Sequence, residues 1–134
     1  AKLNSAALST AGEFQANTAS KVLPVDTVWN AATFIAMTDG ATITPDFGAG
    51  FNFSVTLGGN RTLANPTNPK VGQSGVIAIS EDATGGRTLA FGSYYKFTDG
   101  VNPTIDTTAS RLTLFSYFVI SSTSIFLTMA RGVR

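Results

Sequence analysis

The sequence predicts an all-β protein: an antiparallel β-sandwich of jelly-roll type that follows a short N-terminal arm. Three observations predict it. The 134 residues include 19 threonines, 12 serines and 13 glycines, a composition suited to strands joined by tight turns. Several segments alternate apolar and polar residues, and turn signals separate them. Because 43% of the residues are hydrophobic and the mean hydropathy is +0.18, the chain has enough apolar material for a single core.

The first 21 residues are small and polar, and they are expected to form the arm. Their bulky apolar side chains are Leu3, Leu8 and Phe14, and Gly12 weakens any short helix among them. Two interpretations stay open, a loose terminus and a segment that becomes ordered against a partner. The three bulky side chains are candidate interface residues, and residues 22–134 are expected to form the β-sandwich domain.

The first half of that domain has a mixed segment and a clear strand. Residues 25–37 combine β-branched and aromatic side chains and end at Asp39-Gly40, a dipeptide typical of hairpin turns. Residues 51–57 alternate Phe, Val and Leu with Asn, Ser and Thr, which predicts a strand with one buried face. The sequence Gly58-Gly59-Asn60 marks its end.

Further strands are expected over residues 74–80, 87–91, 111–120 and 123–130. The last two are separated by Ser121-Ser122, which predicts a tight antiparallel hairpin. Turn signals recur at irregular spacings along the chain. This irregularity argues against a fixed-period repeat and against a β-helix.

The terminal hairpin is apolar on both faces. Because a long apolar face is poorly tolerated in water, Phe115, Tyr117, Val119 and Phe126 are candidate residues of an interface with another molecule. The alternative is that the hairpin lies centrally and is covered by loops of its own chain.

The composition excludes several function classes. A net charge of +1 without a basic cluster does not favour nucleic-acid binding. The absence of cysteine and histidine removes disulfides, almost all zinc sites and the common nucleophilic triads, and no cofactor or metal is expected. The longest apolar run is too short to span a membrane.

Paired carboxylates are the main catalytic option that remains, but nearly all acidic residues lie beside Gly, Pro or Thr, as in turns. The segment 81–86 lacks the spaced acids of a calcium loop, so a structural turn is expected there. Enzymatic activity is therefore not expected. The best candidates for a glycan contact are Tyr94 and Tyr95, because flat aromatic rings stack on sugars.

One long segment carries a specific pattern. It has Gly58 to Leu63, then Pro66-Thr67-Asn68, then Asp82 and Gly85 to Leu89, followed by Phe91, Tyr95 and Phe97. This pattern resembles a module found in tailed-bacteriophage tail-fibre, minor tail and capsid-decorating proteins, and the likeness covers about residues 38–132. The resemblance implies a virion structural protein with a β-sandwich fold, working as a homo-oligomer, most often a trimer, with no catalytic residues.

Because only a short arm precedes the domain, the expected function is a capsid decoration or cement protein that binds the major capsid protein or another virion protein and stabilises the shell. The alternative is a tail-fibre or receptor-binding tip domain that recognises host glycans through Tyr94 and Tyr95. A glycan-cleaving enzyme using two of the acids is the third hypothesis. The expected location is the virion, on the outer capsid or tail, after synthesis in the host cytoplasm.

Overall fold

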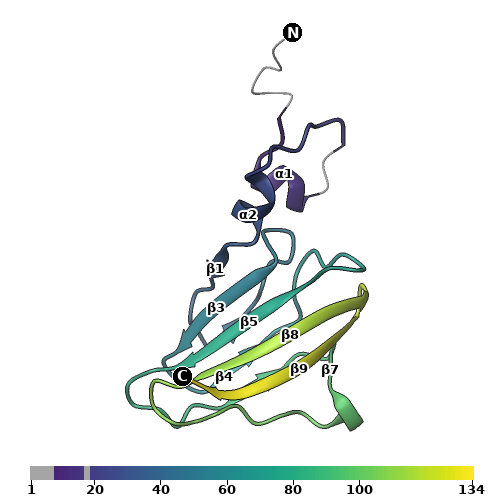
Figure 1. Ribbon diagram of the computed structural model, residues 1–134. Helices are drawn as coiled ribbons and strands as arrows, with labels where there is room; N and C mark the ends of the chain where they lie inside the picture. The colour runs from purple at the N-terminus through teal and green to yellow at the C-terminus, as the bar shows by residue number, and fades with distance from the viewer. Residues whose placement is uncertain (1–7, 17–18) are drawn as a thin grey trace.

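The computed structural model describes residues 8–16 and 19–134, and it shows a β-sandwich with a two-helix segment projecting from one end (Figure 1). The larger sheet has six strands in the order β1-β3-β5-β8-β9-β7, and the smaller sheet has the order β2-β4-β6. The all-β prediction is therefore confirmed. Among the described residues no helix is long and apolar enough to cross a membrane.

The elements follow one another in a regular order along the chain. They are α1 (Ala11–Gln15), α2 (Thr27–Ala31), β1 (Phe34–Ala36), β2 (Thr42–Ile43), β3 (Asn52–Leu57), β4 (Arg61–Leu63), β5 (Ser74–Glu81), β6 (Leu89–Phe91), β7 (Tyr95–Lys96), the 3-10 helix η2 (Thr98–Gly100), β8 (Leu112–Ser121) and β9 (Ser124–Val133). Three times in succession, a strand of the larger sheet is followed by a short strand of the smaller one. The chain therefore winds through three successive coils before the final hairpin.

The strand directions in these coils differ from the antiparallel arrangement that the sequence predicts. Strands β1, β3 and β5 pair in parallel, and so do β2, β4 and β6. The turn at Asp39-Gly40 leads from one sheet to the other, so it is not a hairpin, and the expected antiparallel arrangement is wrong for this half. Coiling was also not expected, because the coils differ in length: Phe34 pairs with Asn52, whereas Phe53 pairs with Ile77.

The second half is antiparallel, as the sequence predicts. Strand β8 pairs with β5 on one side and with β9 on the other, and Ser121 faces Ser124 across the tight turn. Strand β7 then adds to β9 in parallel and closes that side of the sheet. The sandwich is thus a parallel coiled half joined to an antiparallel hairpin.

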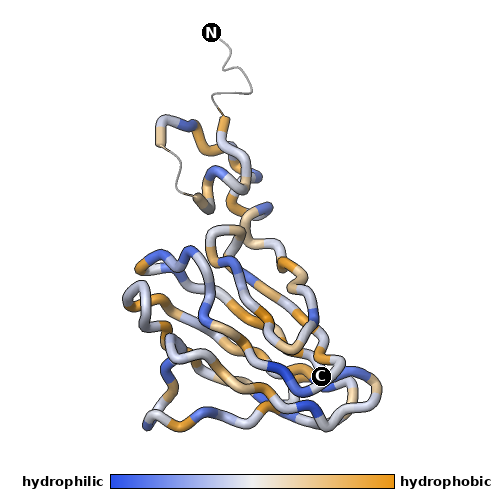
Figure 2. The backbone as a smooth tube through the Cα atoms, turned by 180° about the vertical axis from the view of Figure 1, so that it is seen from behind, coloured by the Kyte–Doolittle hydropathy of each residue, from blue (hydrophilic) through white to orange (hydrophobic). Residues whose placement is uncertain are grey.

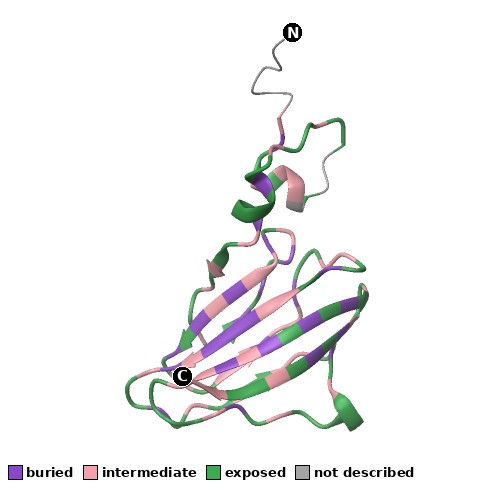
Figure 3. Cartoon of the chain, in the orientation of Figure 1, coloured by how far each residue is buried: buried purple, intermediate pink, exposed green. Residues whose placement is uncertain are grey.

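The core lies between the two sheets and follows the alternation of the strands. In β3, Phe53, Val55 and Leu57 are buried, while Ser54 and Thr56 lie on the other face, so the predicted period of two is confirmed. Ile43 and Leu63 of the smaller sheet are fully enclosed with them. Figure 3 shows the resulting stripes of buried and less buried residues along the larger sheet.

Glycines allow two close approaches that this core requires. A side chain at Gly75 would collide with the carbonyl oxygen of Phe51, so the loop before β3 can pack directly on β5. At Gly85 the backbone has φ of +71°, and a Cβ would come within 2.7 Å of the Ala109 nitrogen. These two positions fix loops on opposite sides of β5.

Candidate functional site

The predicted interface residues on the terminal hairpin divide between its two faces. Phe115, Tyr117 and Val119 are at most 3% exposed and belong to the core. The prediction that they form an interface is wrong, because their own chain covers them, as the alternative interpretation held. Phe126 lies on the opposite face, 37% exposed, directly across from Phe118 at 48%.

That opposite face belongs to the whole larger sheet and carries almost no charge. Strand register places Ala36, Ser54, Ala78, Leu114 and Ala130 in one row across five strands. The neighbouring rows also consist mainly of uncharged side chains, and one of these rows ends at Lys96 of β7. We call this the outer sheet face; through β1, β3, β5, β8 and β9 as far as residue 130 it comprises Phe34, Ala36, Asn52, Ser54, Thr56, Ser74, Val76, Ala78, Ser80, Leu112, Leu114, Ser116, Phe118, Ile120, Ser124, Phe126, Thr128 and Ala130.

The predicted arm residues have different surroundings. Leu3 lies outside the described residues. Leu8 forms a parallel bridge with Val22, and the amide of Ser9 donates to the Val22 carbonyl at 2.8 Å. The Phe14 ring meets Phe51 edge to face, with centroids 5.9 Å apart. The helical segment therefore spans the expected boundary at residue 21.

Helix α1 is held by a capping box at its N-terminal end and by an ion pair of Glu13. The Thr10 side chain accepts from the Glu13 amide, and the Glu13 carboxylate accepts from the Thr10 amide, which forms a capping box. Glu13 also pairs with Lys21 at 3.1 Å. The Thr10 amide and the Lys21 ammonium lower the pKa of Glu13 by stabilising its charged form.

The predicted glycan contacts are not an exposed aromatic platform. Tyr95 is 5% exposed, its hydroxyl donates to the Ala64 carbonyl at 2.9 Å, and burial raises its pKa. Tyr94 is partly buried against the core, and its amide donates to Asn65 at 2.8 Å. The assignment of Tyr95 as a glycan contact is therefore wrong, because its ring faces the interior.

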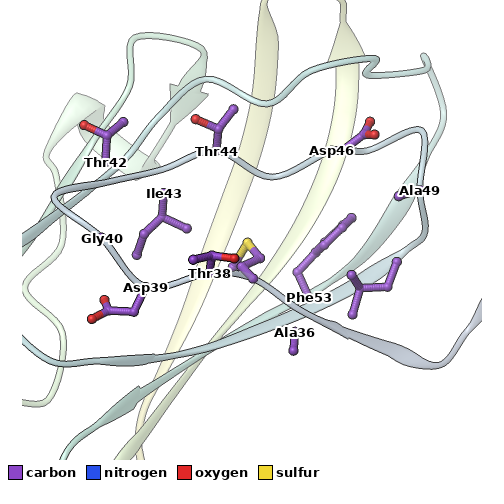
Figure 4. A pocket seen from close by; sticks show the side chains of 12 residues that line it. Ala36, Thr38, Asp39, Gly40, Thr42, Ile43, Thr44, Asp46, Ala49 and Phe53 are labelled. Carbon is purple, nitrogen blue, oxygen red and sulfur yellow. The ribbon is translucent and has the colours of Figure 1, made fainter.

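A pocket of about 430 Å³ opens instead at the bare edge formed by β1 and β2 (Figure 4). Ile43 and Phe53 lie at its base, and both are almost completely buried. Figure 4 shows the side chains of Thr42 and Thr44 pointing away from Ile43, whereas the Thr38 side chain lies between the two strands. The pocket thus has an apolar base with one threonine side chain beside it.

The acidic residues beside the pocket are bound to other groups of the chain. Asp39 accepts two hydrogen bonds from the Arg61 guanidinium, both 2.8 Å, and this contact lowers the pKa of Asp39. The Asp46 carboxylate accepts from the Gly48 amide and from Asn68, each at 2.9 Å. These contacts link neighbouring coils, because Asp39 and Asp46 lie in the first coil and Arg61 and Asn68 in the second.

A second acidic cluster lies where β5 ends. Glu81 faces inward, 3% exposed, and burial raises its pKa. Asp82 points outward and pairs with Arg87 at 2.8 Å, which lowers the pKa of Asp82. The expected structural turn at 81–86 is present, and the Asp82 carboxylate accepts from the amides of Thr84 and Gly85. In the described part of the chain no three acidic side chains gather as a metal site would require.

A third feature, which was not predicted from the sequence, is the apolar surface of the two-helix segment. Trp29 is 79% exposed and Val25 is 92% exposed. Figure 2 shows hydrophobic positions recurring along this projecting part of the chain. The sequence shows residues 25–37 only as a segment of mixed β-branched and aromatic side chains, which does not indicate which of them are exposed.

Comparison with known proteins gives one match. Residues 43–122 match a family model described as "Putative phage tail fibre C-terminal domain". The matched range is 80 of the 134 residues and runs from β2 to the end of β8. No curated protein and no solved structure matches the chain.

Proposed function

Because the chain belongs to the family of phage tail fibre C-terminal domains, we propose that it serves as a non-enzymatic structural domain of a tail fibre. The family makes it a phage structural protein associated with the virion. The family match is the observation that carries the proposal, since it covers both sheets from β2 to β8. It favours the tail fibre, which was the alternative in the sequence analysis, over the capsid decoration protein expected there.

Two properties of the fold suit this function. Asp39 is paired with Arg61, and the carboxylates of Asp46, Asp82 and Asp106 accept backbone amides in turns, which favours a structural over a catalytic role for these acids. The uncharged outer sheet face suits association with further copies of the chain, and we propose that the working form is a homotrimer.

Localisation and adsorption together test the proposed function. Phage particles are incubated with Fab fragments raised against the purified domain, and adsorption to host cells is measured. A tail-fibre domain at the host-contacting end predicts Fab on the tails and slower adsorption. Fab bound to the heads, with unchanged adsorption, would favour the decoration protein instead.

Glycan recognition is a second candidate function, and the pocket between β1 and β2 is the observation that favours it. The Thr38 side chain and the apolar base can contact the polar and the apolar parts of a sugar. The test is a glycan array probed with the wild-type protein and with Thr38→Tyr, whose larger side chain would occupy the pocket. Binding that Thr38→Tyr abolishes would assign the site, whereas binding that it leaves unchanged, or no binding at all, would reject it.

A further inference from the structure

The two-helix segment has small residues in its buried interior, and its large apolar residues other than Leu8 and Phe14 are exposed. Ser9, Thr27 and Ala31 form its buried interior, and the Thr27 hydroxyl donates to the Ser9 carbonyl at 3.2 Å. Such small side chains bury little apolar area, and two helices of five residues are too short to be stable without packing. The contacts inside the segment therefore do not explain its apolar composition.

The exposed apolar side chains concentrate in one short range. The described residues leave eleven large hydrophobic side chains exposed, and six of them lie between residues 22 and 34. We call these six the N-terminal apolar patch: Val22, Leu23, Val25, Val28, Trp29 and Phe34. In Figure 3 most of this range is exposed, in contrast to the striped strands below it.

The size of the patch matches an interface between copies. With about 200 Å² for a whole aromatic side chain and about 100 Å² for an aliphatic one, the exposed fractions amount to roughly 500 Å² per copy. In a trimer whose three patches meet, each copy would bury roughly 500 Å² and the three together about 1,500 Å², an area typical of specific interfaces.

The character of the patch also favours a copy of this chain as its occupant. Asp26 is the one charged residue in the range 22–34. The patch therefore lacks the clustered charges with which an interface selects a partner of opposite charge. Phe34 belongs both to the patch and to the outer sheet face, where it pairs with Asn52. The apolar surface is therefore continuous with the uncharged face on which we propose trimer contacts.

We propose that the N-terminal apolar patch is the principal contact between copies of this chain, with Trp29 as its central side chain. This proposal rests on the proposed function in one respect, because it takes the tail-fibre domain to work as a homo-oligomer. The patch lies ahead of residues 43–122, the range that the family model matches. Association through it therefore adds a property beyond that match.

The chain contains its own reporter for this contact, because Trp29 is its one tryptophan. The test measures tryptophan emission, acrylamide quenching and molar mass by light scattering over a range of protein concentrations. As copies associate, we expect emission to move to shorter wavelength and quenching to fall, in step with the rise in mass. Dilution should reverse all three changes.

Variants of exposed valines provide a matched comparison. Val25→Ser removes an exposed side chain of the patch, and Val71→Ser removes one that is 73% exposed but lies far from it in sequence. We expect Val25→Ser to weaken association about tenfold or more, since a buried valine contributes on that scale, and Val71→Ser to leave it unchanged. Far-ultraviolet circular dichroism confirms that both variants are folded.

Two results would overturn the proposal. One is an oligomer in which Trp29 remains fully accessible to acrylamide, and the other is a monomer at every concentration. Neither result changes where Fab fragments bind on the phage, so failure of this contact is distinguishable from failure of the tail-fibre assignment.

Discussion

The side chain of Gln73 is predicted to be a major source of stability in the described structure. Its amide nitrogen lies 3.0 Å from the Phe47 carbonyl, 2.9 Å from the Gly50 carbonyl and 3.2 Å from the Tyr117 hydroxyl. The Tyr117 hydroxyl donates in turn to the Phe51 carbonyl at 2.7 Å. This network attaches the loop between β2 and β3 to β5 and β8.

The size of the effect follows from the groups left without partners. Gln73 is only 9% exposed. Replacing it by Leu leaves the carbonyls of Phe47 and Gly50 without this hydrogen-bond donor. Each unsatisfied buried carbonyl costs about 1–3 kcal/mol of the free energy of unfolding. Because water reaches part of the loop, we expect the two carbonyls together to cost about 2–4 kcal/mol. Tyr117→Phe removes two hydrogen bonds, the one that its hydroxyl donates to the Phe51 carbonyl and the one that it accepts from Gln73, and should cost about 1–3 kcal/mol.

Urea denaturation of the two single variants and the double variant measures these losses. Because both side chains belong to one network, the double variant should lose less than the two single losses together. Thr104→Ala, at an exposed position in the loop before β8, is the control and should change stability by less than about 0.5 kcal/mol. A Gln73→Leu variant as stable as the wild type would show that these carbonyls do not depend on the Gln73 amide.

The remaining predictions concern a buried acid, a glycine and a tyrosine. Burial raises the pKa of Glu81 above its usual 4.5, so its contribution to stability is greatest below pH 4.5 and is lost as pH rises through the folded-state pKa. Glu81→Gln should remove this part of the pH dependence in denaturation curves measured from pH 4 to 7. A stability difference between variant and wild type that stays constant from pH 4 to 7 would contradict this role of Glu81. Gly75→Ala should destabilise the fold by more than about 2 kcal/mol, since its Cβ would collide with the Phe51 carbonyl, and thermal melting would show this as a fall of several degrees. Tyr95→Phe leaves the Ala64 carbonyl without its donor and should cost about 1 kcal/mol in urea denaturation, and a neutral result would mean that water replaces the hydroxyl.

The strands were predictable from the sequence because their side chains alternate. The alternation over 51–57 corresponds to β3, and the terminal hairpin lies within two or three residues of its expected bounds. Strand direction was not predictable, since a period of two is the same in parallel and antiparallel sheets. The coils also differ in length, so no fixed repeat shows in the sequence.

The candidate site was predictable only in part, and β8 shows why. Its two faces are both apolar, so alternation alone cannot tell which one the second sheet covers; Phe115 proved to be buried and Phe118 exposed. Trp29 was missed for a related reason, because an apolar residue beside β-branched neighbours resembles a strand interior. The capping box at Thr10 and Glu13 was a readable signal that a helical segment precedes the strands.

The position of the protein on the phage particle decides between a tail-fibre domain and a capsid decoration protein. Electron microscopy of particles labelled with Fab fragments against the domain gives that position without any assumption about ligand or oligomer. A tail-fibre domain predicts label on the tail fibres and none on the head shell. Regular label over the head, with bare tails, would contradict it and return the protein to the class of capsid decoration proteins.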